Sequence, residues 1–185
     1  MNTSLILVDI QNDYFPGGKM ELVGSLEAGD QARKLLEYFR RRDLPRLHIQ
    51  HLSIRPGASF FIPGSEGVNI HKLVQPIENE VVYQKNYPNS FRSTPLLEHL
   101  QNSGVQRLVI CGMMTHMCID ATTRAAYDYG FDCVVVQDAC ATRNLTFQDQ
   151  VIPAQHVHYS FLAALKSTYA RVLNAGDIAT EEFWA

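Results

Sequence analysis

Short apolar runs alternate along this chain with longer segments of helical periodicity. The runs at 4–9 and 106–112 are continuous, which is typical of strands covered on both faces of a sheet. Residues 26–42 repeat apolar side chains at the spacing of an amphipathic helix. Strands that alternate with helices predict a parallel sheet with helices on both sides. We therefore expect a three-layer α/β/α fold of Rossmann-like type, with a six-stranded, mainly parallel sheet.

The other expected elements complete this alternation. Further strands are predicted at 45–51, 80–85, 131–138 and 170–174, and further helices at 94–103, 112–130 and 154–168. Residues 52–79 are rich in proline and glycine and have no sustained period, so they form a long loop, and long loops in compact domains are usually functional. No linker or internal repeat divides the sequence. Residues 1–185 are therefore expected to form a single domain.

Composition excludes several classes of function. The chain has 185 residues, a net charge of -3 and an apolar content of 46%. This charge offers no attraction to nucleic acid or to an acidic membrane surface, and no apolar run approaches the roughly 20 residues that cross a bilayer. The N-terminal segment lacks the basic residues of a secretory signal. The four cysteines have no CxxC spacing, so we expect reduced thiols and a cytoplasmic location.

Three chemically distinct side chains fall at the carboxyl ends of predicted strands, where open α/β sheets bind ligands. Asp9 ends the first strand, Lys85 ends the third, and the fourth leads into Cys118. A helix N-terminus near Cys118 favours a thiolate, Asp9 can accept its proton, and Lys85 can stabilise charge. Backbone N–H groups in the turn from Met114 to Cys118 can hold an oxyanion. This set predicts attack on a carbonyl carbon and a thioester.

Each of these residues also has an ordinary structural interpretation. Unpaired cysteine is among the most buried residue types, and Cys118 shares a helical face with Thr122 and Ala126. Asp9 is equally compatible with a turn or cap, and Lys85 with a solvated surface charge. The residues alone leave catalysis and core packing open.

Four segments, in this order, resemble the isochorismatase-like cysteine hydrolases. They are "LILVDIQNDYF" (5–15), "KNYPNSF" (85–91), "GMMTHMCIDATTRAAYDYGF" (112–131) and "QDACAT" (137–142). The similarity extends from the first strand to about residue 173. Within the family, "PGSEG" (63–67) and "GMMTHMC" (112–118) are similar to the subgroup that includes enzymes related to streptothricin hydrolase.

The resemblance implies a catalytic triad, which falls on Asp9, Lys85 and Cys118. It also implies a cis peptide bond between Met113 and Met114, and an oxyanion hole made by the backbone amides of Met114 and Cys118. By the same analogy, the substrate pocket is shaped by side chains of the first loop and of the 52–67 loop: Gln11, Phe15 and Phe61. The implied ligand is a small molecule, without a cofactor.

Two departures from family patterns narrow the expected chemistry. Members that cleave the vinyl ether isochorismate lack the nucleophilic cysteine, so its presence here favours amide-type hydrolysis. Nicotinamidases of the family bind a metal through an aspartate two residues before a histidine. Here His51 is preceded by Ile49 at that position, and His48 and His71 have no confirming carboxylate partner. We therefore expect no metal.

The leading hypothesis is a cysteine-dependent hydrolase of a small amide or related C–N bond. The alternatives are a non-catalytic member of the fold, a thiol-redox protein in which Cys140 approaches Cys118, and a vinyl-ether hydrolase. His116 is expected at a surface or interface rather than in a Cys–His pair. An exposed apolar C-terminal segment (181–185), together with family habit, suggests a homo-oligomer, either a dimer or a tetramer.

Overall fold

One parallel sheet forms the centre of the molecule. The computed structural model describes the backbone of residues 1–185 and every side chain except that of Glu181. The sheet has the strand order β3-β2-β1-β4-β5-β8, and every pairing in it is parallel. The strands are β1 (Thr3–Val8), β2 (Arg46–His51), β3 (Val81–Lys85), β4 (Arg107–Met113), β5 (Asp132–Ala141) and β8 (Arg171–Leu173). The predicted six-stranded α/β fold is confirmed.

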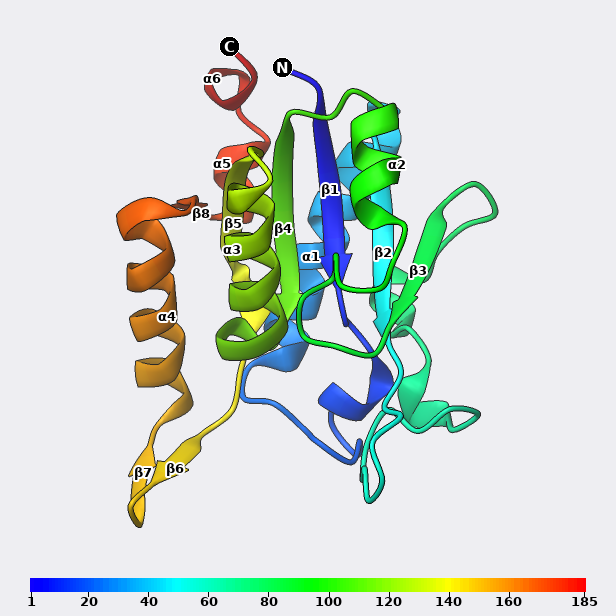
Figure 1. Ribbon diagram of the computed structural model, residues 1–185. Coiled ribbons are helices and arrows are strands. Elements are labelled where there is room, and N and C mark those ends of the chain that lie inside the picture. Colours follow the sequence, from blue (N-terminus) through cyan, green and yellow to red (C-terminus); the bar gives the residue numbers. More distant parts are fainter.

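Helices cover both faces of this sheet (Figure 1). One face packs against α1 (Ser25–Arg41), α5 (Ala175–Ile178) and α6 (Glu181–Trp184), and the other against α2 (Leu96–Asn102), α3 (Asp120–Asp128) and α4 (Ala154–Thr168). The two cores follow from the two-residue period of a strand. In β1, Leu5 and Leu7 belong to the α1 core, whereas Ile6 and Val8 belong to the core under α2 and α3.

Two expectations for the second half of the chain need correction. A hairpin of β6 (Leu145–Phe147) and β7 (Gln150–Ile152) projects from the body (Figure 1), although its three-residue strands were too short to leave an alternating pattern. The C-terminal aromatic residues are not exposed as expected. Phe183 is buried, and the Trp184 ring lies 6.1 Å from that of Tyr38, because α1 presents aromatic side chains to them.

The long loop after β2 is held over the carboxyl ends of the strands. It contains two short 3₁₀ turns, Glu66–Val68 and Lys72–Val74, and a third turn, Asn12–Tyr14, follows β1. The Asp13 carboxylate accepts hydrogen bonds from the backbone N–H of Phe61 at 2.6 Å and of Lys19 at 3.1 Å. A side chain at Gly67 would overlap that carboxylate, which explains the glycine. Within the described residues, no helix is both long and apolar enough to cross a membrane.

Candidate active site

The three residues singled out at the strand ends lie together in space. Asp9 follows β1 directly, with a left-handed φ of 52° that turns the chain at the sheet edge. Lys85 is the last residue of β3, and Cys118 lies in a π-helical turn (Thr115–Ile119) between β4 and α3. All three are buried. A carboxylate, an amine and a thiol from distant parts of the sequence therefore share one water-excluded site.

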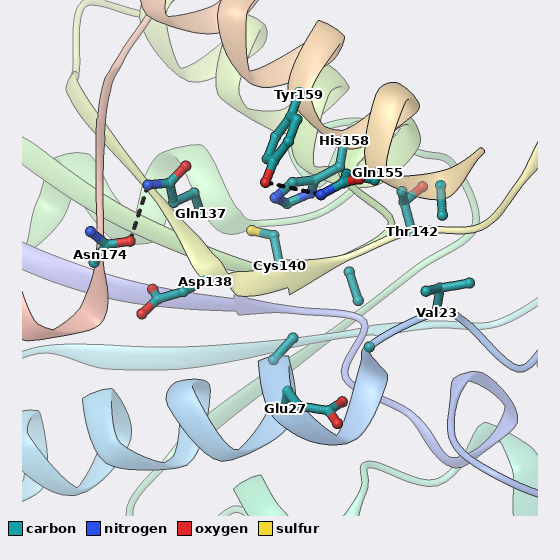
Figure 2. Close-up of a pocket in the computed structure, with 14 residues that line it drawn as sticks. Val23, Glu27, Gln137, Asp138, Cys140, Thr142, Gln155, His158, Tyr159 and Asn174 are labelled. Carbon is teal, nitrogen blue, oxygen red and sulfur yellow. Dashed lines mark hydrogen bonds between the residues drawn. The ribbon is translucent and has the colours of Figure 1, made fainter. Parts of the chain in front are cut away.

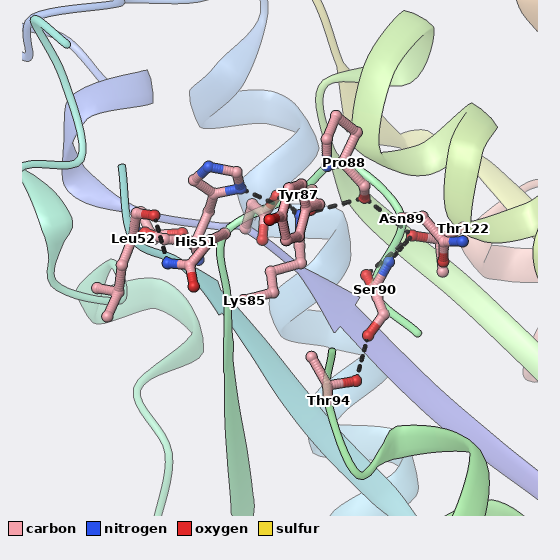
Figure 3. Close-up of polar contacts among 12 residues, drawn as sticks. His51, Leu52, Lys85, Tyr87, Pro88, Asn89, Ser90, Thr94 and Thr122 are labelled. Carbon is pink, nitrogen blue, oxygen red and sulfur yellow. Dashed lines mark hydrogen bonds and ion pairs between the residues drawn. The ribbon is translucent and has the colours of Figure 1, made fainter. Parts of the chain in front are cut away.

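The Lys85 ammonium is fully engaged in hydrogen bonds (Figure 3). It donates to Asp9 Oδ2 at 2.7 Å and to the carbonyl oxygens of Tyr87 at 3.1 Å and Pro88 at 3.2 Å, and it lies 3.3 Å from His51 Nδ1. Burial alone lowers the pKa of Lys85, but the charge of Asp9 and its hydrogen bond to the ammonium oppose this effect, and the pKa is raised. The amine is therefore a fixed positive charge.

One oxygen of the Asp9 carboxylate has been left without a protein partner. Oδ1 is buried and has no hydrogen-bond partner among the described residues, which is costly for a carboxylate. A carboxylate oxygen of Asp9, a ring nitrogen of His51 and the Cys118 sulfur all lie within 4.8 Å of one another. The Asp9 carboxylate thus lies beside the thiol, and its Oδ1 has an unused capacity to accept a hydrogen bond.

The Cys118 thiol is protonated in this site, contrary to the expectation of a thiolate. Burial raises its pKa most, the Asp9 charge raises it further, and Lys85 only partly opposes them, so the pKa lies well above that of free cysteine. A helix N-terminus contributes only about 1 kcal/mol to an anion, and desolvation of a buried charge costs more. Nucleophilic attack therefore needs a base.

The backbone around the nucleophile has unusual geometry. The Met113–Met114 peptide bond is cis, and the Met114 carbonyl accepts the N–H groups of Met117 at 3.0 Å and Ile119 at 3.3 Å. Gly112, just before this bond, has a φ of 125°, and a side chain there would overlap the Val8 carbonyl oxygen. The strand end thus requires glycine to bring the turn against β1.

A cavity of about 310 Å³ opens onto Cys118. Its wall is formed by Tyr14, His51, Ser53, Ile54, Arg55, Pro56, Gly57, Ala58, Ser59, Phe60, Phe61, Asn86, Pro88, Met114, Met117 and Cys118. The 52–67 loop supplies about half of it, and Phe61 lies in the wall as the resemblance implied. This cavity is the space through which a small molecule can reach the Cys118 sulfur.

Two residues expected in the pocket wall lie behind it, which corrects that expectation. Gln11 is fully buried, and its amide donates to the carbonyls of His51 at 2.9 Å and Val68 at 2.7 Å and accepts the His51 N–H at 2.7 Å. Phe15 stacks on His71, with ring centroids 3.7 Å apart. Both side chains support the loop and do not line the cavity.

Sequence reasoning missed the layer that positions Lys85. Thr122 lies one turn of helix after Cys118, and its hydroxyl is 2.8 Å from that of Ser90 and accepts the Ser90 N–H at 3.1 Å (Figure 3). Ser90 lies two residues after Pro88, whose carbonyl oxygen accepts a hydrogen bond from Lys85. The signal was available, because Cys118 and Thr122 share a helical face, but that face was equally compatible with core packing.

The histidines divide into different environments. His48 is paired with Glu80 at 3.0 Å, and His116 is 2.6 Å from the Thr142 hydroxyl, away from the thiol set. His51 alone joins Asp9 and Cys118 in a group whose donor types zinc accepts. The Lys85 ammonium, 2.7 Å from Asp9, opposes a cation there. Burial lowers the pKa of His51, so its imidazole is neutral.

A second cavity of about 410 Å³ lies between β5, the first turn of α1 and α4 (Figure 2). Cys140 and Thr142 come from β5 and the residue after it, Glu27 from α1, and His158 and Tyr159 from α4. It does not contain Asp9, Lys85 or Cys118. Cys118 thus lines the other cavity, and Asp9 and Lys85 line neither of the two.

Known proteins share both the sequence and this architecture. Residues 3–159 match the family model of the isochorismatase domain. The isochorismatase family protein YddQ of Bacillus subtilis is 52% identical over 93% of this chain and 96% of its own length. A crystal structure of an isochorismatase hydrolase from Oleispira antarctica is 47% identical and covers 96% of this chain and 95% of that chain, with a TM-score of 0.92.

More distant relatives carry names of amide or related hydrolases. Maleamate amidohydrolase of Pseudomonas putida is 29% identical over 76% of this chain and 73% of its own length. Streptothricin hydrolase of Streptomyces noursei is 31% identical over 77% of this chain and 50% of its own length. The fold, the matched domain and these relatives agree: the chain belongs to the isochorismatase family of hydrolases.

Proposed function

We propose that this hydrolase cleaves a small amide or related C–N bond through a thioester on Cys118. The observation that carries the proposal is the Asp9 carboxylate, whose Oδ1 has no partner among the described residues, within 4.8 Å of a protonated, buried thiol that lines a cavity. A buried carboxylate oxygen without a hydrogen-bond partner lowers the stability of the fold. Here it can accept the thiol proton, which must leave the sulfur when Cys118 attacks a carbonyl carbon.

In the acylation step, Asp9 Oδ1 accepts the thiol proton as the Cys118 sulfur attacks the carbonyl carbon. The S–C bond forms, and the carbonyl π electrons move to oxygen. The backbone amides of Met114 and Cys118 are proposed to stabilise that oxygen. When the C–N bond breaks, Asp9 returns the proton to the leaving nitrogen, which departs as ammonia or an amine.

In the deacylation step, Asp9 acts as a base a second time. It takes a proton from water, whose oxygen attacks the thioester carbon. The C–S bond breaks, the acid product leaves, and the proton returns to the Cys118 sulfur. Lys85 holds the Asp9 carboxylate in place through both steps, because its ammonium donates to Oδ2 at 2.7 Å.

The test is interception of the acyl-enzyme. A panel of small primary amides, including maleamate, is incubated with enzyme in the presence and absence of hydroxylamine. We expect hydroxamate to form at the expense of acid, and neither product with Cys118→Ala or Asp9→Asn. Hydrolysis that persists in Cys118→Ala, or full turnover without hydroxamate at saturating hydroxylamine, would contradict the thioester.

We also propose that the protein is a homo-oligomer, a dimer or a tetramer. Large apolar side chains are exposed on the β6–β7 hairpin and on α4: Phe147, Val151 and Tyr159. An isolated two-stranded hairpin is marginally stable in water, so a partner surface would stabilise it. Light scattering coupled to gel filtration gives the mass directly, and a monomer at micromolar concentration contradicts this proposal.

A further inference from the structure

The wall of the cavity over Cys118 carries one charged side chain of the Asp, Glu, Lys and Arg types, Arg55. We propose that the substrate is an amide that also bears a carboxylate, and that Arg55 binds this carboxylate while the amide carbonyl lies at Cys118. This inference rests on the proposed amide hydrolysis and adds the class of substrate. An arginine guanidinium is planar and permanently charged, and two of its N–H groups can donate hydrogen bonds to the two oxygens of a carboxylate.

Arg55 is available for such a ligand. Most other arginines of the chain have an acidic or aromatic partner, as Arg40 has with Glu80 and Arg124 with Asp120. Arg55 is in no ion pair among the residues the structure describes, and the cavity wall holds no aspartate or glutamate to compete for it. Its guanidinium is thus an unused positive charge at the rim of a substrate cavity.

The charges beneath the cavity do not cancel Arg55. The Asp9 carboxylate is offset by the Lys85 ammonium at 2.7 Å, so this pair is close to neutral. Burial lowers the pKa of His51, and the charge of Arg55 contributes to that shift, so the imidazole adds no charge at neutral pH. The Asp13 carboxylate behind the wall is engaged by the backbone N–H groups of Phe61 and Lys19, so the charge that the wall itself presents to a ligand is that of Arg55.

Arg55 is placed by a loop with two fixed ends. Ser53 donates its N–H to the Phe61 carbonyl at 2.9 Å, and the Ala58 N–H closes a turn onto the Arg55 carbonyl at 3.1 Å. The Asp13 carboxylate holds Phe61 at 2.6 Å. The loop thus returns to its starting point, which holds the Arg55 backbone at the cavity wall, with its side chain exposed.

Aromatic and sulfur-containing side chains form part of the cavity wall, alongside polar ones such as Ser53 and Asn86. The rings of Tyr14, Phe60 and Phe61 contact one another, with centroids 4.5–5.9 Å apart, and Met117 lies in the same wall. The cavity of about 310 Å³ is at the small end of the roughly 300–1,000 Å³ range of ligand pockets. A short hydrocarbon chain between a carboxylate and a primary amide fits this lining.

The first measurement is binding without turnover. Cys118→Ala protein is titrated by calorimetry with a series of monoamides of dicarboxylic acids, from oxamate to glutaramate, each paired with its uncharged diamide. We expect at least one acid to bind about tenfold or more tightly than its diamide, and added salt to reduce this preference. Equal binding within every pair, or binding of neither member of any pair, overturns the inference.

Variants then assign the preference to Arg55. In the Cys118→Ala background, Arg55→Gln should bring the acid and the diamide to within about twofold, and Arg55→Lys should keep part of the difference. Arg41→Gln is the matched control, because Arg41 is an exposed arginine at the far end of α1. A preference that survives Arg55→Gln unchanged shows that another group binds the carboxylate and overturns the role of Arg55.

Turnover separates this inference from the proposed function. With Cys118 intact, the preferred acid should be hydrolysed with a higher kcat/KM than its diamide, and Arg55→Gln should lower this ratio mainly through KM. Hydrolysis of both members at equal kcat/KM leaves the thioester mechanism standing and overturns the anionic substrate. Selective binding of the acid without any hydrolysis supports the charged site and contradicts amide hydrolysis.

Discussion

Two buried carboxylates in this protein are treated in opposite ways by their surroundings. Glu80, at the start of β3, accepts hydrogen bonds from Arg40 and Arg46 and is 3.0 Å from His48 Nε2, and it also accepts the Ile77 N–H at 3.2 Å. Both of its oxygens are used. Asp9 has one oxygen on Lys85 and the other unpartnered among the described residues.

The difference separates a structural carboxylate from a reactive one. At Glu80, burial raises the pKa, but the hydrogen bonds from two arginines and a histidine outweigh it and hold the pKa far below its ordinary value. Such an oxygen pair has no capacity left for a substrate or a proton. At Asp9 one carboxylate oxygen has no hydrogen-bond partner among the described residues, and the carboxylate lies within 4.8 Å of the thiol.

The largest expected effect is loss of activity without loss of fold. Cys118→Ala should reduce kcat/KM by about 10⁴-fold on any amide that the enzyme accepts, with a melting temperature within a few degrees of wild type. Cys140→Ala, which removes a buried thiol outside the triad, is the control and should keep activity. Equal activity in the Cys118→Ala and Cys140→Ala variants would show that Cys118 is not the nucleophile.

Glu80→Gln should instead lower the stability of the fold and leave the activity unchanged. Removal of this charge leaves Arg40 and Arg46 without their buried partner, so the free energy of unfolding should fall by about 3–5 kcal/mol. The kcat/KM of the folded fraction should not change. Urea titration measures the stability, and Glu78→Gln, an exposed neighbour, should cost almost nothing.

The Glu80→Gln variant also tests how this carboxylate makes the stability of the fold depend on pH. The folded pKa of Glu80 is depressed, so its contribution is present above the unfolded value of about 4.3 and is lost as pH falls below it. Wild type should therefore lose stability steeply in acid, whereas Glu80→Gln should lose less over the same range. Parallel curves for the two proteins would contradict a role for this carboxylate in acid unfolding.

Alkylation tests the protonated thiol. Because burial and Asp9 raise the pKa of Cys118, iodoacetamide without substrate should modify it at least about tenfold more slowly at pH 7 than in urea, where thiols have an ordinary pKa of about 8.5. The rate should rise as pH increases above neutrality. Intact-protein mass spectrometry follows it, and fast alkylation at pH 7 would indicate a thiolate.

The smallest effect on activity is expected for Thr122, which contacts the segment that binds Lys85 but not Lys85 itself. Thr122→Val removes the hydroxyl that binds Ser90 and should lower kcat about five- to tenfold, the cost of about one buried hydrogen bond, whereas Thr122→Ser should restore it. Thr123→Val is a close control, because this neighbouring buried hydroxyl has no hydrogen-bond partner among the described residues. A decrease in Thr123→Val as large as that in Thr122→Val would show a general packing defect instead.

The sequence predicted the sheet and the meeting of Asp9, Lys85 and Cys118, because parallel strands place their carboxyl ends at one edge. The roles of these three residues remain a prediction. The sequence could not place Gln11 or Phe15, because the left-handed φ at Asp9 redirects the chain after β1. Nor could it show that burial would dominate the pKa of Cys118, since desolvation depends on the loop folded above the thiol.

The five residues from Asp9 to Asp13 include one residue of the proposed triad and two residues that hold the loop around the cavity in place. Gln11 fixes His51 at the start of the long loop, and Asp13 fixes Phe61 further along it. Between these two fixed points, residues 53–60 form the cavity rim without bonding to Asp9. This stretch is therefore a natural unit for loop exchange: relatives' versions of it can be grafted to change substrate range, while the reacting groups keep their positions.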